Sequence, residues 1–163
     1  SCGQRSQVAL GLILAQNADL LVLDDFSMGL DPGYRRLFVD YLRDFAKAEG
    51  KTVFLTSHII QDMERLIDDC IIMDYGRILV QQPVAELLAT FRRYTFPAAD
   101  AAALPQGDGI YHPAVWKGRG ELYSFASPDE IRDRLTRAGI ACGELRWETL
   151  NLEDAFIGLT GKY

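Results

Sequence analysis

The first half of the chain alternates short apolar runs with amphipathic stretches of helical spacing. Leu20–Leu23 is an apolar run too short to form one face of a helix, and it predicts a strand buried on both faces, as in a parallel sheet. Residues 52–56 and 70–73 repeat this pattern. Residues 32–49 and 59–67 instead place apolar side chains three and four positions apart, as a helix does. Strand, helix, strand, helix and strand in this order predict an α/β fold with a parallel sheet.

Local signals mark the ends of several of these elements. Asp31 followed by Pro32 is typical of a helix N-cap and a first helical position. Residues 74–77 predict a turn that closes a hairpin on the third strand, and Pro83 predicts the start of a further helix. The predicted elements are therefore short and closely spaced.

The pattern changes near Pro97, where an alanine-rich stretch predicts a linker. Beyond it, residues 115–126 predict a hairpin, and residues 127–139 predict a helix that begins with a capping box. Residues 140–147 predict a strand, and Asn151 is the expected cap of a last helix. We therefore expect a partial α/β domain, a linker and a small α+β domain, at residues 1–93, 94–109 and 110–163.

Composition and charge exclude several classes of protein. The net charge of −6 argues against a protein that binds the phosphate backbone of nucleic acids, which would need a basic face. The three cysteines are far apart and form no CxxC pair, so they predict reduced thiols rather than a disulfide framework or a zinc site. No apolar run approaches the roughly 18 residues of a membrane span, and nothing resembles a signal peptide. We expect a soluble chain whose connection to a membrane, if it has one, runs through a partner.

Candidate chemistry lies at the ends of two predicted strands. Asp24 and Asp25 end the first strand, and His58 follows the second. The carboxyl ends of parallel strands meet at one edge of the sheet, where ligands of α/β proteins bind. A carboxylate there can hold Mg²⁺, and its neighbour can orient or deprotonate an attacking water. Two adjacent acids can also simply open a turn, and the strand alone does not separate these interpretations.

The first residues suit a helix that binds an anion. Ser1 and Gly3 precede a stretch of helical spacing, and a hydroxyl, a glycine backbone and the free N–H groups of a first turn all favour a phosphate. An ordinary serine N-cap explains the same residues, and the first four residues alone favour it.

Taken together, these segments resemble the second half of the ATPase domain of ABC transporters. Residues 1–4 resemble the signature motif, with Cys2 at the usual place of a glycine, and residues 20–24 resemble the Walker B strand. Residues 29–32 resemble the D-loop, and His58 takes the place of the switch histidine. These motifs follow one another at the family's separations across residues 1–93. Residues 151–161 are similar to the end of ATPase subunits that serve ABC-2-type exporters, which often carry a small α+β domain.

The resemblance implies a partial P-loop NTPase fold that works with ATP and Mg²⁺. Two ATPase subunits close head to tail around two ATP molecules and drive an integral membrane permease from the cytoplasmic face of the cell membrane. It implies that Asp24 holds Mg²⁺ through water, that Asp25 is the catalytic carboxylate and that His58 contacts the γ-phosphate. It also implies that four residues contact nucleotide, namely Ser1, Gly3, Gln4 and Asp31. Ser1 and Gly3 would make this contact across the dimer.

The chain departs from the family in three ways. It contains neither a Walker A glycine loop with its lysine nor the glutamine loop, so these residues alone should not bind ATP well. Asp25 replaces the usual glutamate and is shorter by one carbon–carbon bond, about 1.5 Å. A 1 Å misplacement can cost on the order of 10²-fold in rate, so a slow site is expected. Phe26 and Met28 also differ from the usual D-loop residues.

Two interpretations from different classes follow. The chain is expected to be the C-terminal part of an ATP-hydrolysing exporter subunit, inactive when taken alone. Alternatively, it is a natural half-domain that regulates or binds a partner without hydrolysis. The set of Ser1, Asp24, Asp25 and His58 favours the first, because an interaction module has no need of all four. ATPases of DNA repair share these motifs, but that assignment leaves the C-terminal segment unexplained.

Overall fold

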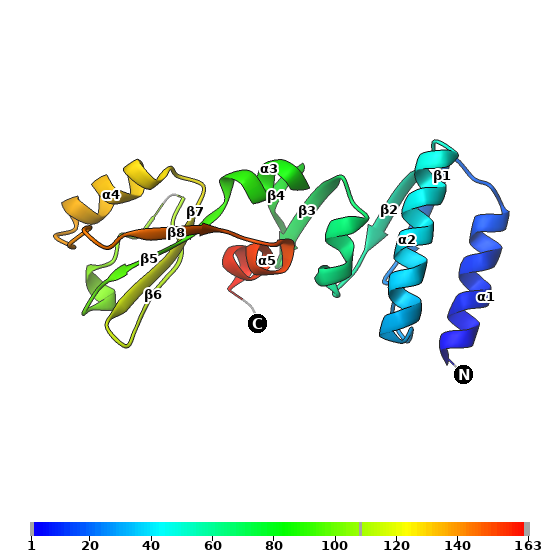
Figure 1. Cartoon of the computed structure of the whole chain (residues 1–163), viewed down its shortest axis with the longest axis horizontal. Coiled ribbons are helices and arrows are strands. Elements are labelled where there is room, and N and C mark those ends of the chain that lie inside the picture. The colour runs from blue at the N-terminus through cyan, green and yellow to red at the C-terminus, as the bar shows by residue number, and fades with distance from the viewer. Residues whose placement is uncertain (1, 108, 162–163) are drawn as a thin grey trace. The chain divides into compact units, whose positions relative to one another are not determined.

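The computed structural model describes residues 2–107 and 109–161, which form two compact units (Figure 1). The first unit comprises residues 1–67 and the second residues 68–163. This division falls before the predicted boundary at residue 93, and the three domains expected from the sequence stay a prediction. The two units are described separately.

The first unit has the predicted alternation of helices and parallel strands. Strand β1 (Leu20–Asp24) pairs in parallel with β2 (Thr52–Thr56), and Asp24 lies opposite Thr56. Three helical elements accompany these strands, namely α1 (Cys2–Ala15), α2 (Pro32–Ala48) and the 3₁₀ helix η1 (Ile60–Arg65). The mixed fold of parallel strands and helices confirms the predicted α/β class. The segment predicted as a helix at residues 59–67 is instead the short 3₁₀ turn η1.

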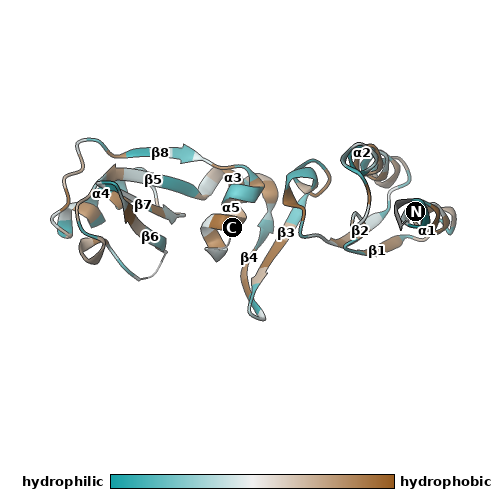
Figure 2. Cartoon of the chain, turned by 90° about the horizontal axis from the view of Figure 1, so that it is seen from below, coloured by the Kyte–Doolittle hydropathy of each residue, from teal (hydrophilic) through white to brown (hydrophobic). Residues whose placement is uncertain are grey.

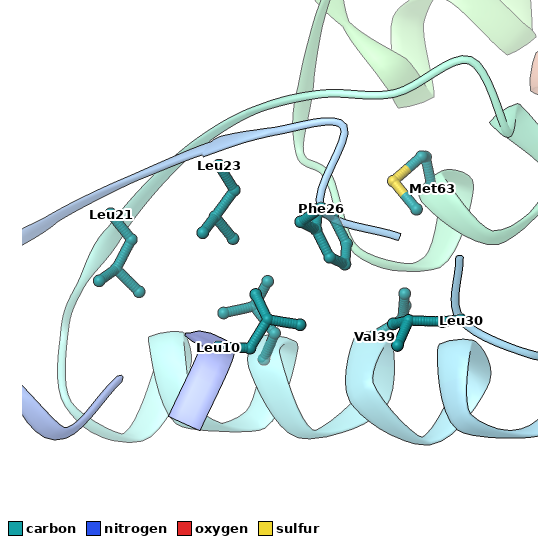
Figure 3. Close-up of a cluster of buried hydrophobic side chains, with 8 residues drawn as sticks. Leu10, Leu21, Leu23, Phe26, Leu30, Val39 and Met63 are labelled. Atoms are coloured by element: carbon teal, nitrogen blue, oxygen red, sulfur yellow. The ribbon is translucent and has the colours of Figure 1, made fainter. Parts of the chain in front are cut away.

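The core of the first unit lies on one face of β1 (Figure 3). Leu21 and Leu23 are 2% and 4% exposed, and they pack with apolar side chains from both α helices and from η1, among them Leu10, Val39, Leu42 and Met63. Burying such side chains is the main term that stabilises this unit.

The other face of the strand pair is open, which corrects one prediction. Leu20, Val22 and Phe54 point away from that core and are 54%, 63% and 55% exposed. The prediction that β1 is buried on both faces is therefore wrong for the described residues. The reason is that α1 and α2 both contribute side chains to the same cluster, on the Leu21 side of the strand. The third apolar run also does not extend this sheet, since β3 (Asp69–Asp74) pairs only with the following strand.

The second unit begins with the predicted hairpin and continues into a four-stranded antiparallel sheet. Strands β3 and β4 (Arg77–Pro83) form the hairpin, and helix α3 (Val84–Thr90) follows. The larger sheet has the order β6-β7-β5-β8. Its strands are β5 (Arg92–Pro97), β6 (Tyr111–Trp116), β7 (Arg119–Ser124) and β8 (Arg146–Thr149), and its remaining helical elements are η2 (Ala101–Ala103), α4 (Pro128–Arg137) and α5 (Leu152–Thr160).

Helix α4 covers the core face of this sheet. Tyr94 and Phe96 of β5 are completely buried and pack with Leu122, Ile131 and Leu135. The Tyr94 hydroxyl donates a hydrogen bond of 2.5 Å to the Ala126 carbonyl, so its polar end is satisfied. Gly120 lies under the Phe96 ring, which occupies the space that a Cβ atom would need.

Two features of the second unit differ from the sequence-based expectation. Strand β5 starts at Arg92 and fills the first positions of the predicted linker. The strand predicted at residues 140–147 is β8, which starts only at Arg146. The helix caps were predicted correctly, since Ser127 and Glu130 form the capping box of α4 and Asn151 caps α5.

Candidate functional site

The candidate site lies where β1 and β2 end, within the first unit. Because the two strands are parallel and Asp24 is opposite Thr56, their carboxyl ends lie at the same edge. The residues that follow each strand therefore come together there, and the structure joins Asp25 to His58 across this edge. The sequence predicted this proximity from the strand order alone.

Thr56 links the two acidic residues. Its hydroxyl donates a hydrogen bond to Asp24 Oδ1 and accepts one of 3.1 Å from the backbone N–H of Asp25. The same N–H also donates to the Thr56 carbonyl at 3.1 Å. One side chain of β2 thus fixes the position of a carboxylate on β1 and of the backbone that follows it.

Asp25 and His58 form a carboxylate–imidazole pair. Asp25 Oδ1 lies 2.9 Å from His58 Nδ1, and the two side chains are 25% and 64% exposed. The Asp25 backbone has φ +43°, a left-handed conformation that aspartate tolerates better than most residues. Such strained positions cluster at functional sites. A carboxylate beside an imidazole, open to solvent, can orient a water or hold and move a proton.

Hydrogen bonds hold the segment that carries His58 in place on both sides of the histidine. The Ser57 hydroxyl accepts a hydrogen bond of 3.0 Å from the Ile59 N–H, which closes a tight turn around the histidine. Four residues further, Asp62 of η1 accepts a hydrogen bond of 2.5 Å from Arg35 of α2, and both side chains are largely buried. This ion pair fixes the segment that follows His58 to α2.

The remaining predicted site residues lie at helix starts. Ser1 lies outside the described residues, whereas Gly3 and Gln4 lie in the first turn of α1. In Figure 1, α1 begins at the marked N-terminus and α2 runs beside it in the same direction. The starts of both helices therefore lie at the end of the unit where the strands finish. The Asp25–His58 contact itself involves neither of these helix starts.

Asp31 has a clear structural role. It is the N-cap of α2, and its Oδ1 accepts hydrogen bonds of 3.0 and 3.2 Å from the backbone N–H groups of Gly33 and Tyr34. This carboxylate satisfies two orphan donors and neutralises the positive end of the helix dipole.

The donor set fits a magnesium ion only in a limited way. Within residues 2–107 and 109–161, no group of three histidine, cysteine, aspartate or glutamate side chains could hold a metal. Asp24 offers one exposed carboxylate, held by the Thr56 hydroxyl. Mg²⁺ is commonly bound by one or two carboxylates, with waters and substrate phosphates as its other ligands. Asp24 therefore fits this mode, and a cage built from protein alone is not present in the described part of the chain.

Sequence reasoning missed three features of the site. Thr56 was predicted only as the last residue of a strand, although the strand register makes it the link between the acids. The Arg35–Asp62 pair carries no signal in a single sequence, because its members are 27 positions apart. The Ser27 hydroxyl, two residues after Asp25, is completely buried and has no hydrogen-bond partner in the described structure. A polar residue inside the apolar loop was the only available signal for it.

Comparison with known proteins gives one family match and several relatives. Residues 3–61 match the family described as "AAA domain, putative AbiEii toxin, Type IV TA system". This match covers α1, both parallel strands and His58, which are the elements of the candidate site. Among the described residues, no helix has the length and apolarity required to cross a membrane.

The relatives match nearly the whole chain. A Nod factor export ATP-binding protein I from Ralstonia nicotianae is 38% identical over 99% of this chain and 53% of the relative. Its counterpart from Rhizobium etli is 30% identical over 99% of this chain and 52% of the relative. The bacitracin transport ATP-binding protein BcrA from Enterococcus faecalis is 28% identical over 99% of this chain and 54% of the relative.

An import protein matches a smaller part. The thiamine import ATP-binding protein ThiQ from a Jannaschia species is 35% identical over 55% of this chain and 39% of the relative. The chain spans about half the length of the curated relatives that match it from end to end. The chain is therefore similar, over 99% of its length, to ATP-binding proteins of ABC transporters.

Proposed function

We propose that this chain is part of an ATP-hydrolysing subunit of an ABC exporter. In this proposal, ATP binding and hydrolysis drive the movement of a substrate through an integral membrane permease. The observation that carries it is the Asp25–His58 pair, 2.9 Å apart at the carboxyl edge of two parallel strands. A merely structural turn requires neither an imidazole at this position nor a left-handed aspartate backbone.

Each residue of the pair has a distinct proposed role. Asp25 accepts a hydrogen bond from the attacking water and orients it toward the γ-phosphate. His58 holds the Asp25 carboxylate in place through Nδ1 and leaves its other ring nitrogen free to contact the γ-phosphate. Thr56 fixes the Asp25 backbone, so that the carboxylate does not have to be ordered during the reaction.

Asp24 is the proposed ligand of Mg²⁺. When bound, the ion would neutralise charge on the β- and γ-phosphates. The Thr56 hydroxyl orients the Asp24 carboxylate toward the open edge, where nucleotide oxygens and water would complete the coordination.

The proposed partners are a second ATPase subunit and a membrane permease. Ser1, Gly3 and Gln4 would face the nucleotide held by the second subunit, at the start of α1, where the positive end of the helix dipole favours a phosphate. Asp31 would lie near this contact while it caps α2. The subunit would lie at the cytoplasmic face of the cell membrane, attached through the permease.

The exporter assignment rests on how much of the chain each relative matches. The Nod factor export proteins match 99% of it, including the second unit, whereas the thiamine import protein matches 55%. A second unit shared with export proteins supports export rather than import.

The test is hydrolysis of Mg-ATP by the protein as isolated from its source cell. Asp25→Asn keeps the size of the side chain but removes its charge, and we expect turnover to fall by about 100-fold or more. Binding of ATP, measured separately by equilibrium dialysis, should change little. The matched control is Asp133→Asn, which makes the same chemical change on exposed α4 and should leave turnover unchanged.

Two outcomes would overturn the proposal. If Asp25→Asn hydrolyses ATP as the unmodified protein does, Asp25 is not the catalytic carboxylate. If the isolated protein neither binds nor hydrolyses ATP, the alternative of a half-domain that binds a partner without hydrolysis takes its place.

A further inference from the structure

Strand β8 leaves one edge of the second unit's sheet unpaired. It pairs with β5 on one side only, because the strand order places it at the end of the sheet. All four of its residues are exposed, and Figure 2 draws it as the outermost strand, in a hydrophilic colour. An exposed edge presents backbone N–H and C=O groups that can pair with another strand.

The register of β8 on β5 assigns its side chains to two faces. Glu148 lies opposite Arg93 and forms an ion pair with it, while Arg146 lies opposite Thr95 on the same face. The Arg146 backbone pairs with β5, but among the described residues its guanidinium has no hydrogen-bond or ion-pair partner. On the other face, Trp147 lies opposite Tyr94 and is 51% exposed, with the Arg92 guanidinium 5.4 Å from its ring centre.

These charges are arranged to attract a second copy of the same strand. Edges that are protected against association commonly carry like charges, which repel another copy. β8 instead carries Arg146 and Glu148 on either side of Trp147, one of each sign. When two β8 strands run antiparallel about a two-fold axis at Trp147, each Arg146 lies opposite the Glu148 of the other copy. Directly opposite charges of unlike sign stabilise a strand pair.

The aromatic side chains match in the same register. Trp147 lies opposite the Trp147 of the other copy, and aromatic pairs across strands are among the favourable ones. The charged face then carries a continuous row, in which Glu148 lies between Arg93 of its own chain and Arg146 of the other copy. The unpaired arginine and the exposed tryptophan both gain a partner.

We propose that two copies of this chain associate through their β8 strands, with Arg146 against Glu148 and Trp147 against Trp147, to form a continuous eight-stranded sheet. This isologous contact uses the same patch on both copies, as a two-fold dimer requires. It involves four residues per strand, so we expect a weak dimer that forms in the micromolar range.

The test is sedimentation velocity of the full chain without nucleotide, from low to high micromolar concentration. The unmodified chain should shift from monomer to dimer over this range. Arg146→Glu places two acidic residues opposite each other at both ends of the contact, and we expect dimerisation to weaken by about 10-fold or more. Because the Arg146 guanidinium has no partner among the described residues of its own chain, this change should not affect folding. Arg137→Glu on α4 makes the same charge change away from β8 and is the control.

Mixing two variants makes the test specific. Glu148→Arg should also be monomeric, because it brings two arginines together. When the Arg146→Glu and Glu148→Arg chains are mixed, unlike charges again lie opposite at both positions, and a heterodimer should form. If Glu148→Arg fails to fold beside Arg93, the series of unmodified chain, Arg146→Gln and Arg146→Glu should show progressively weaker dimers.

Tryptophan emission gives a second readout. Trp116→Phe leaves Trp147 as the sole tryptophan, and its emission should move to shorter wavelength as the concentration rises. Three results would overturn the proposal: a monomer at every concentration, a dimer that Arg146→Glu does not weaken, or no change in Trp147 emission on dimerisation. None of them bears on ATP hydrolysis, because the measurement contains no nucleotide.

Discussion

The two units of the chain separate chemistry from packing. The first unit carries every described residue of the candidate site, and its two-stranded sheet buries only one face. The second unit carries none of those residues, and the core face of its sheet holds fully buried side chains such as Tyr94 and Phe96. The strands of the two units are similarly apolar in sequence, but their side chains are buried to very different extents.

The candidate site therefore depends on few contacts. Asp24, Asp25 and His58 are held by the register of two strands, by two hydroxyls and by one ion pair. The second unit instead depends on the volume of its aromatic side chains. Substitutions should therefore affect stability most in the second unit and activity most in the first.

The largest effect on stability should come from the aromatic core of the second unit. Phe96→Ala removes a completely buried ring that packs over Gly120, and we expect the free energy of unfolding to fall by about 3–5 kcal/mol. Urea unfolding followed by tryptophan emission measures this unit alone, because Trp116 and Trp147 both lie in it. A loss below about 1 kcal/mol would mean that the ring is not part of a close-packed core.

Two substitutions in β1 compare the stability contributed by its covered face with that contributed by its open face. Leu23→Ala, at 4% exposed, should destabilise the first unit by about 2–4 kcal/mol. Val22→Thr, at 63% exposed, should change it by no more than about 0.5 kcal/mol. Hydrogen exchange of the amides in α1 and β2 provides the measurement. Equal losses for both variants would show that the outer face of β1 is covered in solution.

The helix caps, one in each unit, should make small contributions to stability. Asp31→Ala and Ser127→Ala each remove a side chain that accepts hydrogen bonds from a helix start, and each should cost about 1 kcal/mol. Only the Asp31 variant should also lower ATP turnover, because Ser127 lies outside the proposed site. If both variants leave turnover unchanged, Asp31 serves α2 alone.

Local sequence signals predicted much of this arrangement. The caps at Asp31, Ser127 and Asn151 follow from residue types that satisfy free N–H groups, and the structure has all three. The meeting of Asp25 and His58 follows from the order of parallel strands. These signals are reliable because each depends on neighbours in the chain or on one simple rule of topology.

Features that depend on distant partners could not be predicted. β5 looked like part of a linker, because the proline and alanines after it hid a strand whose burial comes from β7 and α4. The open face of β1 has the same composition as the buried face, so only the placement of the helices distinguishes them. The link made by Thr56 requires the strand register, which a single sequence does not contain.

The central claim is that Asp25 and His58 act as one unit in ATP hydrolysis. The most direct test is a double-mutant cycle of ATP turnover with Asp25→Asn, His58→Ala and the two combined. Groups that act together are not additive, so the combined variant should be about as slow as the slower single variant. If the combined loss instead equals the product of the two single losses, the residues act independently, and the 2.9 Å contact between them has no catalytic role.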